Sequence, residues 1–114
     1  PSLVLASYTH PEYAISMAKT LALTGTNTML LRGTEGESVA DPRRMPTMAG
    51  FIRGEQQALE SLKHGPLPTT VELPADVDVD TTVRYIQGAL NGTQQVPTSI
   101  ARQIEHIVQM CSSI

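Results

Sequence analysis

The chain has 114 residues, of which 40% are hydrophobic and 17% charged, and its formal net charge is -3 at pH 7. This length is enough for one small domain with a core. A single cysteine, Cys111, excludes an internal disulfide framework, and no apolar run approaches the roughly 18 residues of a membrane span. The acidic balance gives no general attraction to nucleic-acid phosphates, so any such contact must come from a local patch. We expect a cytoplasmic protein without membrane contact.

The N-terminus predicts that the chain is part of a longer protein. It begins at Pro1, without an initiator methionine, and reaches an apolar segment of core-strand type almost at once, at Leu3. A signal peptide would need a charged region and a longer apolar stretch, and neither is present. We expect residues 1–114 to form a single partial domain, the C-terminal fragment of a larger protein.

The first third of the chain alternates between strand and helix patterns. Residues 3–7 predict a strand, and Thr9 and Glu12 have the spacing of a capping box that begins a helix. Gly25 is placed to end this helix in a left-handed conformation, and residues 26–31 predict the next strand. The expected inward stripe of the helix is Ala14, Ile15, Ala18, Leu21 and Ala22. Strand, helix and strand in this order indicate a βαβ unit with parallel strands.

The middle of the chain leaves two alternatives open. The segment Asp41–Pro46 is predicted to be a loop, because it contains two prolines four residues apart. Residues 55–63 have strong helix propensity, yet residues 51–53 can instead be one arm of a hairpin that turns at Gly54 and Glu55. Propensity alone slightly favours the helix. A turn is expected at residues 64–68, and a short edge strand at residues 70–73.

Two helices are predicted in the last third. Asp78 or Asp80 caps the first, whose apolar positions lie on one face, and Gly92 ends it. Pro97 and Thr98 begin the second. The residues expected on the inward apolar stripes are Val83, Ile86 and Leu90 in the first helix, and Ile100, Ile104, Ile107, Val108 and Cys111 in the second. We expect both helices to cover one face of the sheet, and Cys111 to be a small buried thiol.

The most informative segment is Leu30–Glu37, in which an apolar strand pattern runs into two glycines and two acids. Gly33 and Gly36 allow positive φ and a close approach of the backbone to a bound group. The segment is typical both of a loop that reaches a ligand and of a plain turn after a core strand.

Four segments together give a resemblance to a known family. They are Ser7–Tyr13, Leu31–Glu37, Ala40–Arg44 and the helix end Ala89–Gly92. In this order and at this spacing they resemble the C-terminal part of anthranilate phosphoribosyltransferase-like proteins of glycosyl transferase family 3. Within this family the chain resembles most specifically a divergent branch that carries a Gly-Thr-Glu-Gly-Glu loop. The resemblance covers essentially the whole chain.

The resemblance implies a fold class and a ligand. The fold is α/β: the C-terminal portion of a nucleoside phosphorylase/phosphoribosyltransferase-like domain, with a mixed sheet, a β-hairpin and C-terminal helices. It therefore favours the hairpin in the middle of the chain, and we adopt that prediction. The family uses phosphoribosyl diphosphate and Mg²⁺, and its members are homodimers. This chain lacks the glycine-rich loop on which the family binds the diphosphate, so no cofactor is expected in the chain itself.

The family's magnesium-binding acids are not at the matching positions of this chain. In the enzymes an adjacent Asp and Glu follow the glycine loop, whereas Ser38 and Val39 stand at about these positions here. Glu35 and Glu37 of the loop remain possible ligands of a metal ion, and the alternative for both is simple solvation. We therefore predict a ligand loop of Arg32, Gly33, Thr34, Glu35, Gly36 and Glu37, with no metal ligand and no catalytic residue assigned.

Three further side chains are candidate anion contacts. His10 stands at a helix start, where backbone N–H groups attract anions, and Arg43 and Arg44 form a small basic patch. The alternative for His10 is that it caps the helix, and for Arg43 that it pairs with Asp41. Arg32 of the ligand loop can likewise pair with Glu35 or Glu37 and not with an anion. His64 and His106 are isolated and show no metal-ligand spacing.

Two functions of different class remain. In the first, the whole protein binds phosphoribosyl diphosphate or a related anion as a phosphoribosyltransferase, and this fragment is inactive alone. In the second, it is a non-catalytic relative that binds nucleic acid or another polyanion. The missing acid pair favours the second function, and the acidic net charge counts against strong nucleic-acid binding.

Overall fold

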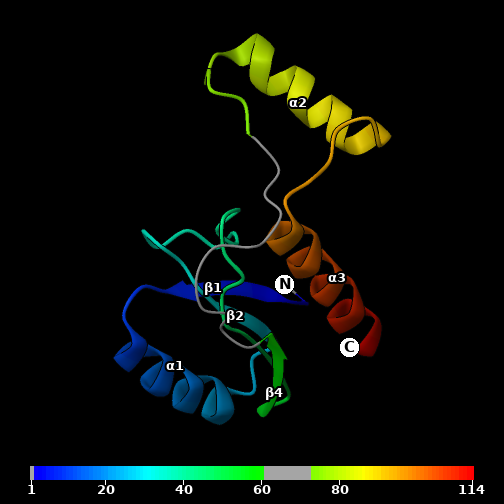
Figure 1. The fold of residues 1–114 in the computed structure, drawn as a ribbon. Helices are drawn as coiled ribbons and strands as arrows, with labels where there is room; N and C mark the ends of the chain where they lie inside the picture. The colour runs from blue at the N-terminus through cyan, green and yellow to red at the C-terminus, as the bar shows by residue number, and fades with distance from the viewer. Residues whose placement is uncertain (1, 61–72) are drawn as a thin grey trace.

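The computed structural model describes residues 2–60 and 73–114. In chain order the elements of these residues are β1 (Val4–Tyr8), α1 (Pro11–Thr24), β2 (Thr28–Arg32), β3 (Met48–Ile52), β4 (Glu55–Glu60), α2 (Val79–Asn91) and α3 (Thr98–Ser113). The strands form one mixed sheet in the order β1-β2-β3-β4 (Figure 1). The β1–β2 pair is parallel and the other two pairs are antiparallel. The predicted α/β class with a mixed sheet and a hairpin is therefore confirmed.

The βαβ unit forms as predicted, with small shifts at its ends. Strands β1 and β2 run parallel with Val4 opposite Thr28, and α1 is the crossover. Gly25 ends α1 at φ 70°, and its N–H donates to the carbonyl of Leu21 at 3.1 Å. The capping box is wrong. The N-cap is His10, with no side-chain cap hydrogen bond, because Pro11 begins the helix one residue later than a Thr9 cap requires.

The middle of the chain forms a hairpin and not a helix. Ile52 pairs with Glu55, so the two turn residues are Arg53 and Gly54, one residue earlier than predicted. Both have positive φ, 51° and 83°, which is the backbone of a two-residue hairpin turn. The helix propensity of residues 55–60 is overridden because these residues pair along the full length of β3.

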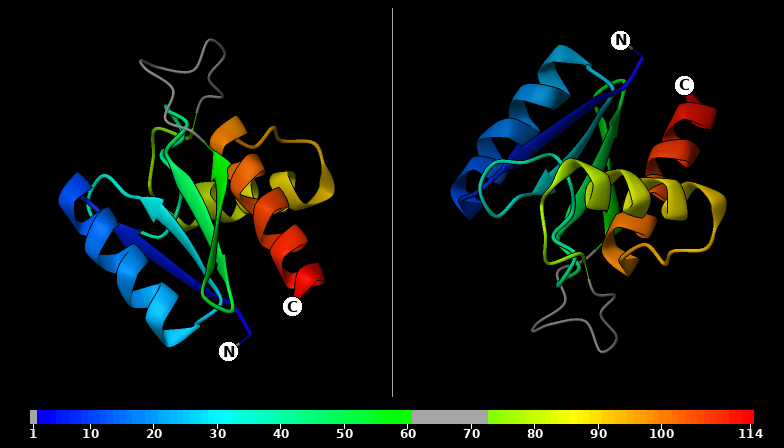
Figure 2. Two further views of the ribbon diagram at one scale, coloured as in Figure 1. Left: turned by 90° about the horizontal axis from the view of Figure 1, so that it is seen from below. Right: turned by 90° about the horizontal axis from the view of Figure 1, so that it is seen from above.

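The sheet lies between α1 on one face and α3 on the other (Figure 2). Strand β2 is buried at Thr28, Met29, Leu30 and Leu31, and its alternate side chains point to opposite faces. The core cluster of buried residues consists of Met29, Leu31, Ala40, Met45, Met48 and Met110. It lies on the face that α3 covers, since Met110 belongs to α3 and the position of a Cβ at Gly50 in β3 is 3.2 Å from its sulfur.

Helix α1 covers its face of the sheet only in part. None of its residues is buried, and Ile15, which was expected on the inward stripe, is 63% exposed. Ala22 is exposed as well, whereas Ala14, Ala18 and Leu21 are half-buried. The prediction of the inward stripe is therefore right for these three residues and wrong for Ile15 and Ala22.

Helix α3 turns a largely polar face to the sheet, contrary to the prediction. Its buried residues are Ser99, Gln103, His106 and Met110. Of the predicted stripe, Ile100 and Ile107 pack against the core, while Ile104, Val108 and Cys111 are exposed. The buried thiol predicted at Cys111 is therefore wrong. The physical reason is that Ser99 and Gln103 hydrogen-bond to the loop between β2 and β3, which fixes the rotation of the helix.

Helix α2 extends away from the sheet, so it does not share in covering a face as predicted (Figure 1). None of its residues is buried, and Val83 and Ile86 of its apolar stripe are 44% and 50% exposed. Its ends agree with the prediction, since Asp78 is the N-cap and Gly92 follows at φ 84°. The turn predicted at residues 64–68 lies outside the described residues, as does the strand predicted at residues 70–73 except for Leu73, which is not in a strand.

Candidate functional site

The predicted ligand loop lies where the carboxyl ends of the two parallel strands meet. Tyr8 and Arg32 end β1 and β2 side by side. The N–H of Gly33 donates to the Tyr8 carbonyl at 2.9 Å, and the Ser7 hydroxyl donates to the Gly36 carbonyl at 2.7 Å. These two bonds fold the loop over the end of β1, next to the start of α1. In α/β sheets this edge is where ligands bind.

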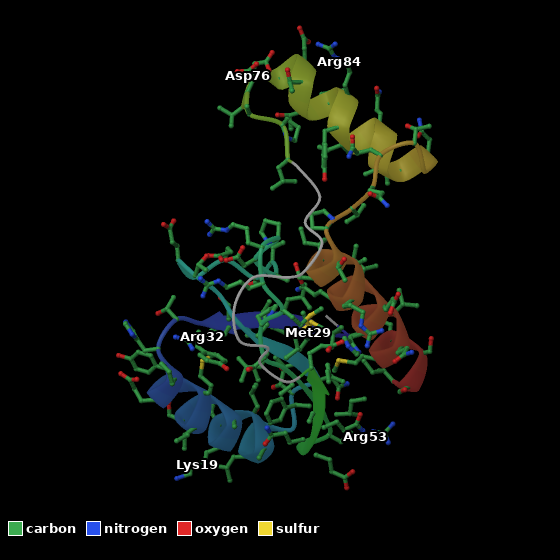
Figure 3. All side chains as sticks on the ribbon, in the orientation of Figure 1. Lys19, Met29, Arg32, Arg53, Asp76 and Arg84 are labelled. Carbon is green, nitrogen blue, oxygen red and sulfur yellow. The ribbon has the colours of Figure 1, made fainter. Side chains whose placement is uncertain are left out.

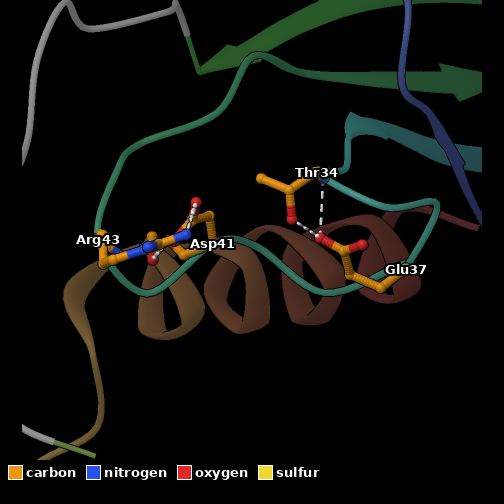
Figure 4. Close-up of polar contacts among 5 residues, drawn as sticks. Thr34, Glu37, Asp41 and Arg43 are labelled. Atoms are coloured by element: carbon orange, nitrogen blue, oxygen red, sulfur yellow. Dashed lines mark hydrogen bonds and ion pairs between the residues drawn. The ribbon is translucent and has the colours of Figure 1, made fainter.

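The carboxylate of Glu37 is held by the loop itself (Figure 4). Its Oε1 accepts hydrogen bonds from the Thr34 N–H at 2.8 Å and from the Thr34 hydroxyl at 2.6 Å, and its Oε2 accepts one from the Glu35 N–H at 2.7 Å. The Thr34 hydroxyl, followed by these backbone donors, lowers the pKa of Glu37 from 4.5 to about 2. Sequence reasoning missed this contact. The signal was a threonine three residues before a glutamate, the spacing of a capping box.

The two loop glycines are required for different reasons, one for its backbone conformation and the other for a close contact. Gly36 has φ 98°, as the prediction of positive φ requires. Gly33 does not have positive φ, but a Cβ there would lie 2.7 Å from the Glu37 carbonyl oxygen. Gly33 therefore allows the close approach that closes the loop on itself.

The loop does not fit the magnesium site that the resemblance implies. Three of the lone-pair positions of the Glu37 carboxylate are taken by loop donors, and Val39 has no ligand atom. The Ser38 carbonyl accepts a hydrogen bond from Gln103 at 2.9 Å. Glu35 remains as one exposed carboxylate. Within residues 2–60 and 73–114, no group of three His, Cys, Asp or Glu residues is arranged to hold a metal ion.

Arg32 and His10 are exposed at the same edge of the sheet. Arg32 ends β2, and the pairing with Glu35 or Glu37 considered above is absent from the ion pairs of the described residues. His10 is the N-cap residue of α1 without a side-chain cap bond, and its ring centroid lies 5.9 Å from that of Tyr13. The Arg32 side chain is set apart from Lys19, which lies further along α1 (Figure 3).

Arg43 is not a free cation. Its Nε lies 3.2 Å from Asp41 Oδ1, and its Nη2 donates to Oδ2 at 3.3 Å, so the pairing alternative is confirmed (Figure 4). Burial raises the pKa of Asp41, but the hydrogen bonds and charge of Arg43 outweigh it and leave the pKa below its usual value. Arg44 is exposed, and its N–H donates to the Asp41 carbonyl at 3.3 Å. The structure therefore brings Arg32 and His10 to the loop edge, and places the basic patch further along the chain.

Helix α3 fixes the segment that follows the ligand loop. The Ser99 hydroxyl donates to the Asp41 carbonyl at 2.6 Å, and the side-chain oxygen of Gln103 accepts from the Ala40 N–H at 2.8 Å. Sequence reasoning missed both residues. Their spacing of four along a helix was visible, but a polar pair at that spacing is typical of a solvated face.

A surface pocket of about 610 Å³ opens between the loop and α3. Its lining residues are Thr34, Glu37, Val39, Ala40, Asp41, Pro42, Arg43, Leu73 and Ile100. This volume is in the range of organic ligand sites, roughly 300–1,000 Å³. The ligand loop thus forms part of a pocket wall.

A second polar cluster lies where α3 meets β4. His106 Nε2 is 2.8 Å from Glu60 Oε1, and Arg102 Nε donates to the same oxygen at 2.7 Å. Burial raises the pKa of Glu60, but the hydrogen bonds from His106 and Arg102 outweigh it and lower the pKa below its usual value. His106, which was expected to be isolated, is therefore a buried contact between α3 and the sheet. His64 lies outside the described residues.

No family model matches this chain, but the chain is similar to a protein of Escherichia coli. Over 103 residues, which make up 90% of this chain, the sequence is 33% identical to the uncharacterized protein YbiB of Escherichia coli (strain K12). The matched region is 32% of that protein, so this chain spans about a third of its length. Among the described residues, no helix has both the length and the hydropathy to cross a bilayer.

Proposed function

We propose that the whole protein is an anthranilate phosphoribosyltransferase-like protein that binds phosphoribosyl diphosphate or a related phosphorylated anion. The ligand lies at the carboxyl edge of the β1–β2 pair, and residues 1–114 are inactive alone. The observation that carries this proposal is the position of the loop Gly33–Glu37. Its bonds to Ser7 and Tyr8 hold it over the end of β1, beside the first turn of α1.

The groups at this edge support binding of a phosphate. In the first turn of α1, Pro11 has no N–H and the Tyr13 N–H donates to the His10 carbonyl at 3.0 Å. The Glu12 N–H remains as a donor at this helix start, since His10 makes no side-chain cap hydrogen bond. The exposed guanidinium of Arg32 adds a cation that matches phosphate oxygens. The acids Glu12, Glu35 and Glu37 oppose this attraction, so the contact of Arg32 is the one that we expect to determine affinity.

Calorimetric titration of the full-length protein with phosphoribosyl diphosphate, with and without Mg²⁺, tests this function. Arg32→Ala should weaken binding roughly tenfold to a hundredfold, because a charge-assisted hydrogen bond contributes roughly 1.5–3 kcal/mol. Lys19→Ala removes the same charge from an exposed position further along α1 and should leave the affinity unchanged. No heat of binding for the unsubstituted protein under either condition would contradict the proposal.

A second function, a non-catalytic protein that binds nucleic acid or another polyanion, is favoured by one observation. Glu37 is bound by its own loop, and Ser38 and Val39 stand where the family carries its acid pair. On this function, affinity for an oligonucleotide falls steeply with salt, and Arg44→Ala reduces the slope by about one. An affinity that does not change with salt would exclude it.

A further inference from the structure

The pocket beside the ligand loop has a mainly apolar wall. Val39, Pro42, Leu73 and Ile100 contribute hydrocarbon surface, and Val39 is 51% exposed. Half-exposed apolar side chains around a space of about 610 Å³ can cover the body of a small organic molecule. The wall therefore favours a ligand with an apolar body.

The charges at the pocket are unequal. Asp41 and Arg43 pair with each other, so their charges largely cancel. Glu37 has no ion-pair partner among residues 2–60 and 73–114, and its carboxylate accepts hydrogen bonds from uncharged donors of Thr34 and Glu35. An uncompensated negative charge thus remains on the wall.

The Glu37 carboxylate is also held in a fixed position. Oε1 accepts two hydrogen bonds and Oε2 accepts one, while a carboxylate has about four lone-pair sites. Oε2 therefore keeps capacity for a further donor. Since the loop has already ordered the side chain, a ligand does not bear the entropic cost of fixing it.

We infer that this pocket binds a small amphipathic amine, with its ammonium group donating to Glu37 and its apolar body on Val39, Pro42 and Ile100. A carboxylated ligand of the same shape meets the Glu37 charge and is disfavoured. The amine site is distinct from the phosphate contacts at Arg32 and His10, and the inference does not depend on the proposed function.

Three probes of similar size and different charge test the ligand class. They are phenethylamine, 2-phenylethanol and phenylacetate, each titrated calorimetrically into the full-length protein without phosphate ligand. We expect affinity in the order amine, alcohol, carboxylate. Equal affinities, a preference for the carboxylate, or no binding of the amine would overturn the inference.

A matched pair of substitutions at Val39 tests the position of the site. Because Val39 is half-exposed, both Val39→Lys and Val39→Glu are compatible with folding. The lysine should weaken phenethylamine binding about fivefold and the glutamate should strengthen it by a similar factor, the effect of one charge pair at close range in water. Unchanged affinity in both variants would place the amine elsewhere and contradict the assignment.

Removal of the Glu37 charge completes the test. Glu37→Gln should abolish the preference for phenethylamine over 2-phenylethanol, and a retained preference would contradict the role of Glu37. Phosphoribosyl diphosphate is titrated separately into the same proteins. Failure of amine binding with intact phosphate binding rejects this inference alone, and the reverse result rejects the proposed function alone.

Discussion

Glu37 remains charged at acidic pH because its loop stabilises the ionised form. The hydrogen bond from the Thr34 hydroxyl is the largest cause of its low pKa, and the backbone N–H donors follow. A carboxyl group whose pKa is lowered by folding stabilises the folded state above its unfolded pKa. That contribution is lost as the pH falls from 4.5 through the folded value of about 2. The closed loop is thus intact over the neutral and mildly acidic range.

The Thr34 hydroxyl can be tested by its effect on this pKa. In Thr34→Val the strongest donor is gone, so the pKa of Glu37 should rise from about 2 towards 4.5. The measurement is an NMR titration of the Glu37 side-chain carboxyl carbon in both proteins. A midpoint near 4.5 in the unsubstituted protein would show that the loop does not hold the carboxylate.

Gly33 and Gly50 differ in what an added methyl group would meet. At Gly33 it lies 2.7 Å from a backbone oxygen, whereas at Gly50 it lies 3.2 Å from the end of the flexible Met110 side chain. Gly33→Ala should therefore lower the free energy of unfolding by roughly 1–3 kcal/mol, and Gly50→Ala by less. Urea unfolding of the two variants measures this difference. A larger cost at Gly50 would contradict the close approach in the loop.

Helix α3 connects the sheet to the pocket through its polar face. Gln103 is 4% exposed and bonds to both Ala40 and Ser38 of the loop that lines the pocket. The apolar residues Ile100 and Ile107 of the same helix pack against the core. The helix thus has a structural role and also positions one wall of the pocket.

Two glutamine substitutions on α3 distinguish the contribution of the Gln103 hydrogen bonds from an effect of helix propensity. Gln103→Ala leaves a buried N–H and a carbonyl without partners and should lower the free energy of unfolding by about 1–3 kcal/mol. Gln109→Ala makes the same change at an exposed position of the helix and should have little effect. Both are measured by urea unfolding. Equal costs would mean that the Gln103 contacts are not formed.

The sequence predicts where α1 and α2 end better than which face the helices bury. Gly25 and Gly92 end α1 and α2 as predicted, because a left-handed residue after a helix is a local requirement. The rotation of α3 depends on bonds from Ser99 and Gln103 to residues about sixty positions away, which periodicity does not report. The hairpin likewise depends on pairing with β3, which overrides local helix propensity.

For the candidate site, too, the sequence predicts the position of the loop but not its side-chain contacts. The βαβ pattern places the loop at the carboxyl edge of two parallel strands, and the structure has it there. The contacts of Glu37 and the pairing of Arg43 depend on side-chain geometry within the loop. Residue types and spacing suggested the pair of Arg43 with Asp41, but gave no means to exclude a pair between Arg32 and Glu35.

On the scale of the whole molecule, both faces of the sheet contribute buried residues. Met29 and Leu31 of β2 belong to the core cluster under α3, while Thr28 and Leu30 alternate to the other face and are buried as well. Helix α2 buries none of its residues. Within the described part of the chain, the buried residues therefore belong to residues 2–60 and to α3 with the residues just before it. Helix α2 extends away from this core (Figure 1).

Two leucine substitutions test this distribution. Leu31 is fully buried, so Leu31→Ala should lower the free energy of unfolding by roughly 2–5 kcal/mol. Leu90 of α2 is 84% exposed, so Leu90→Ala should change it by no more than about 0.5 kcal/mol. Chemical denaturation of the chain provides both values. A large cost at Leu90 would show that α2 packs against a core.

Hydrogen exchange of the full-length protein, followed by mass spectrometry, is the most direct test of the proposed phosphate site. With phosphoribosyl diphosphate and Mg²⁺ added, peptides that cover Arg32–Glu37 and the first turn of α1 should exchange more slowly, and those of α2 should not change. Protection confined to other parts of the protein, with none at the carboxyl edge of β1 and β2, would contradict the account.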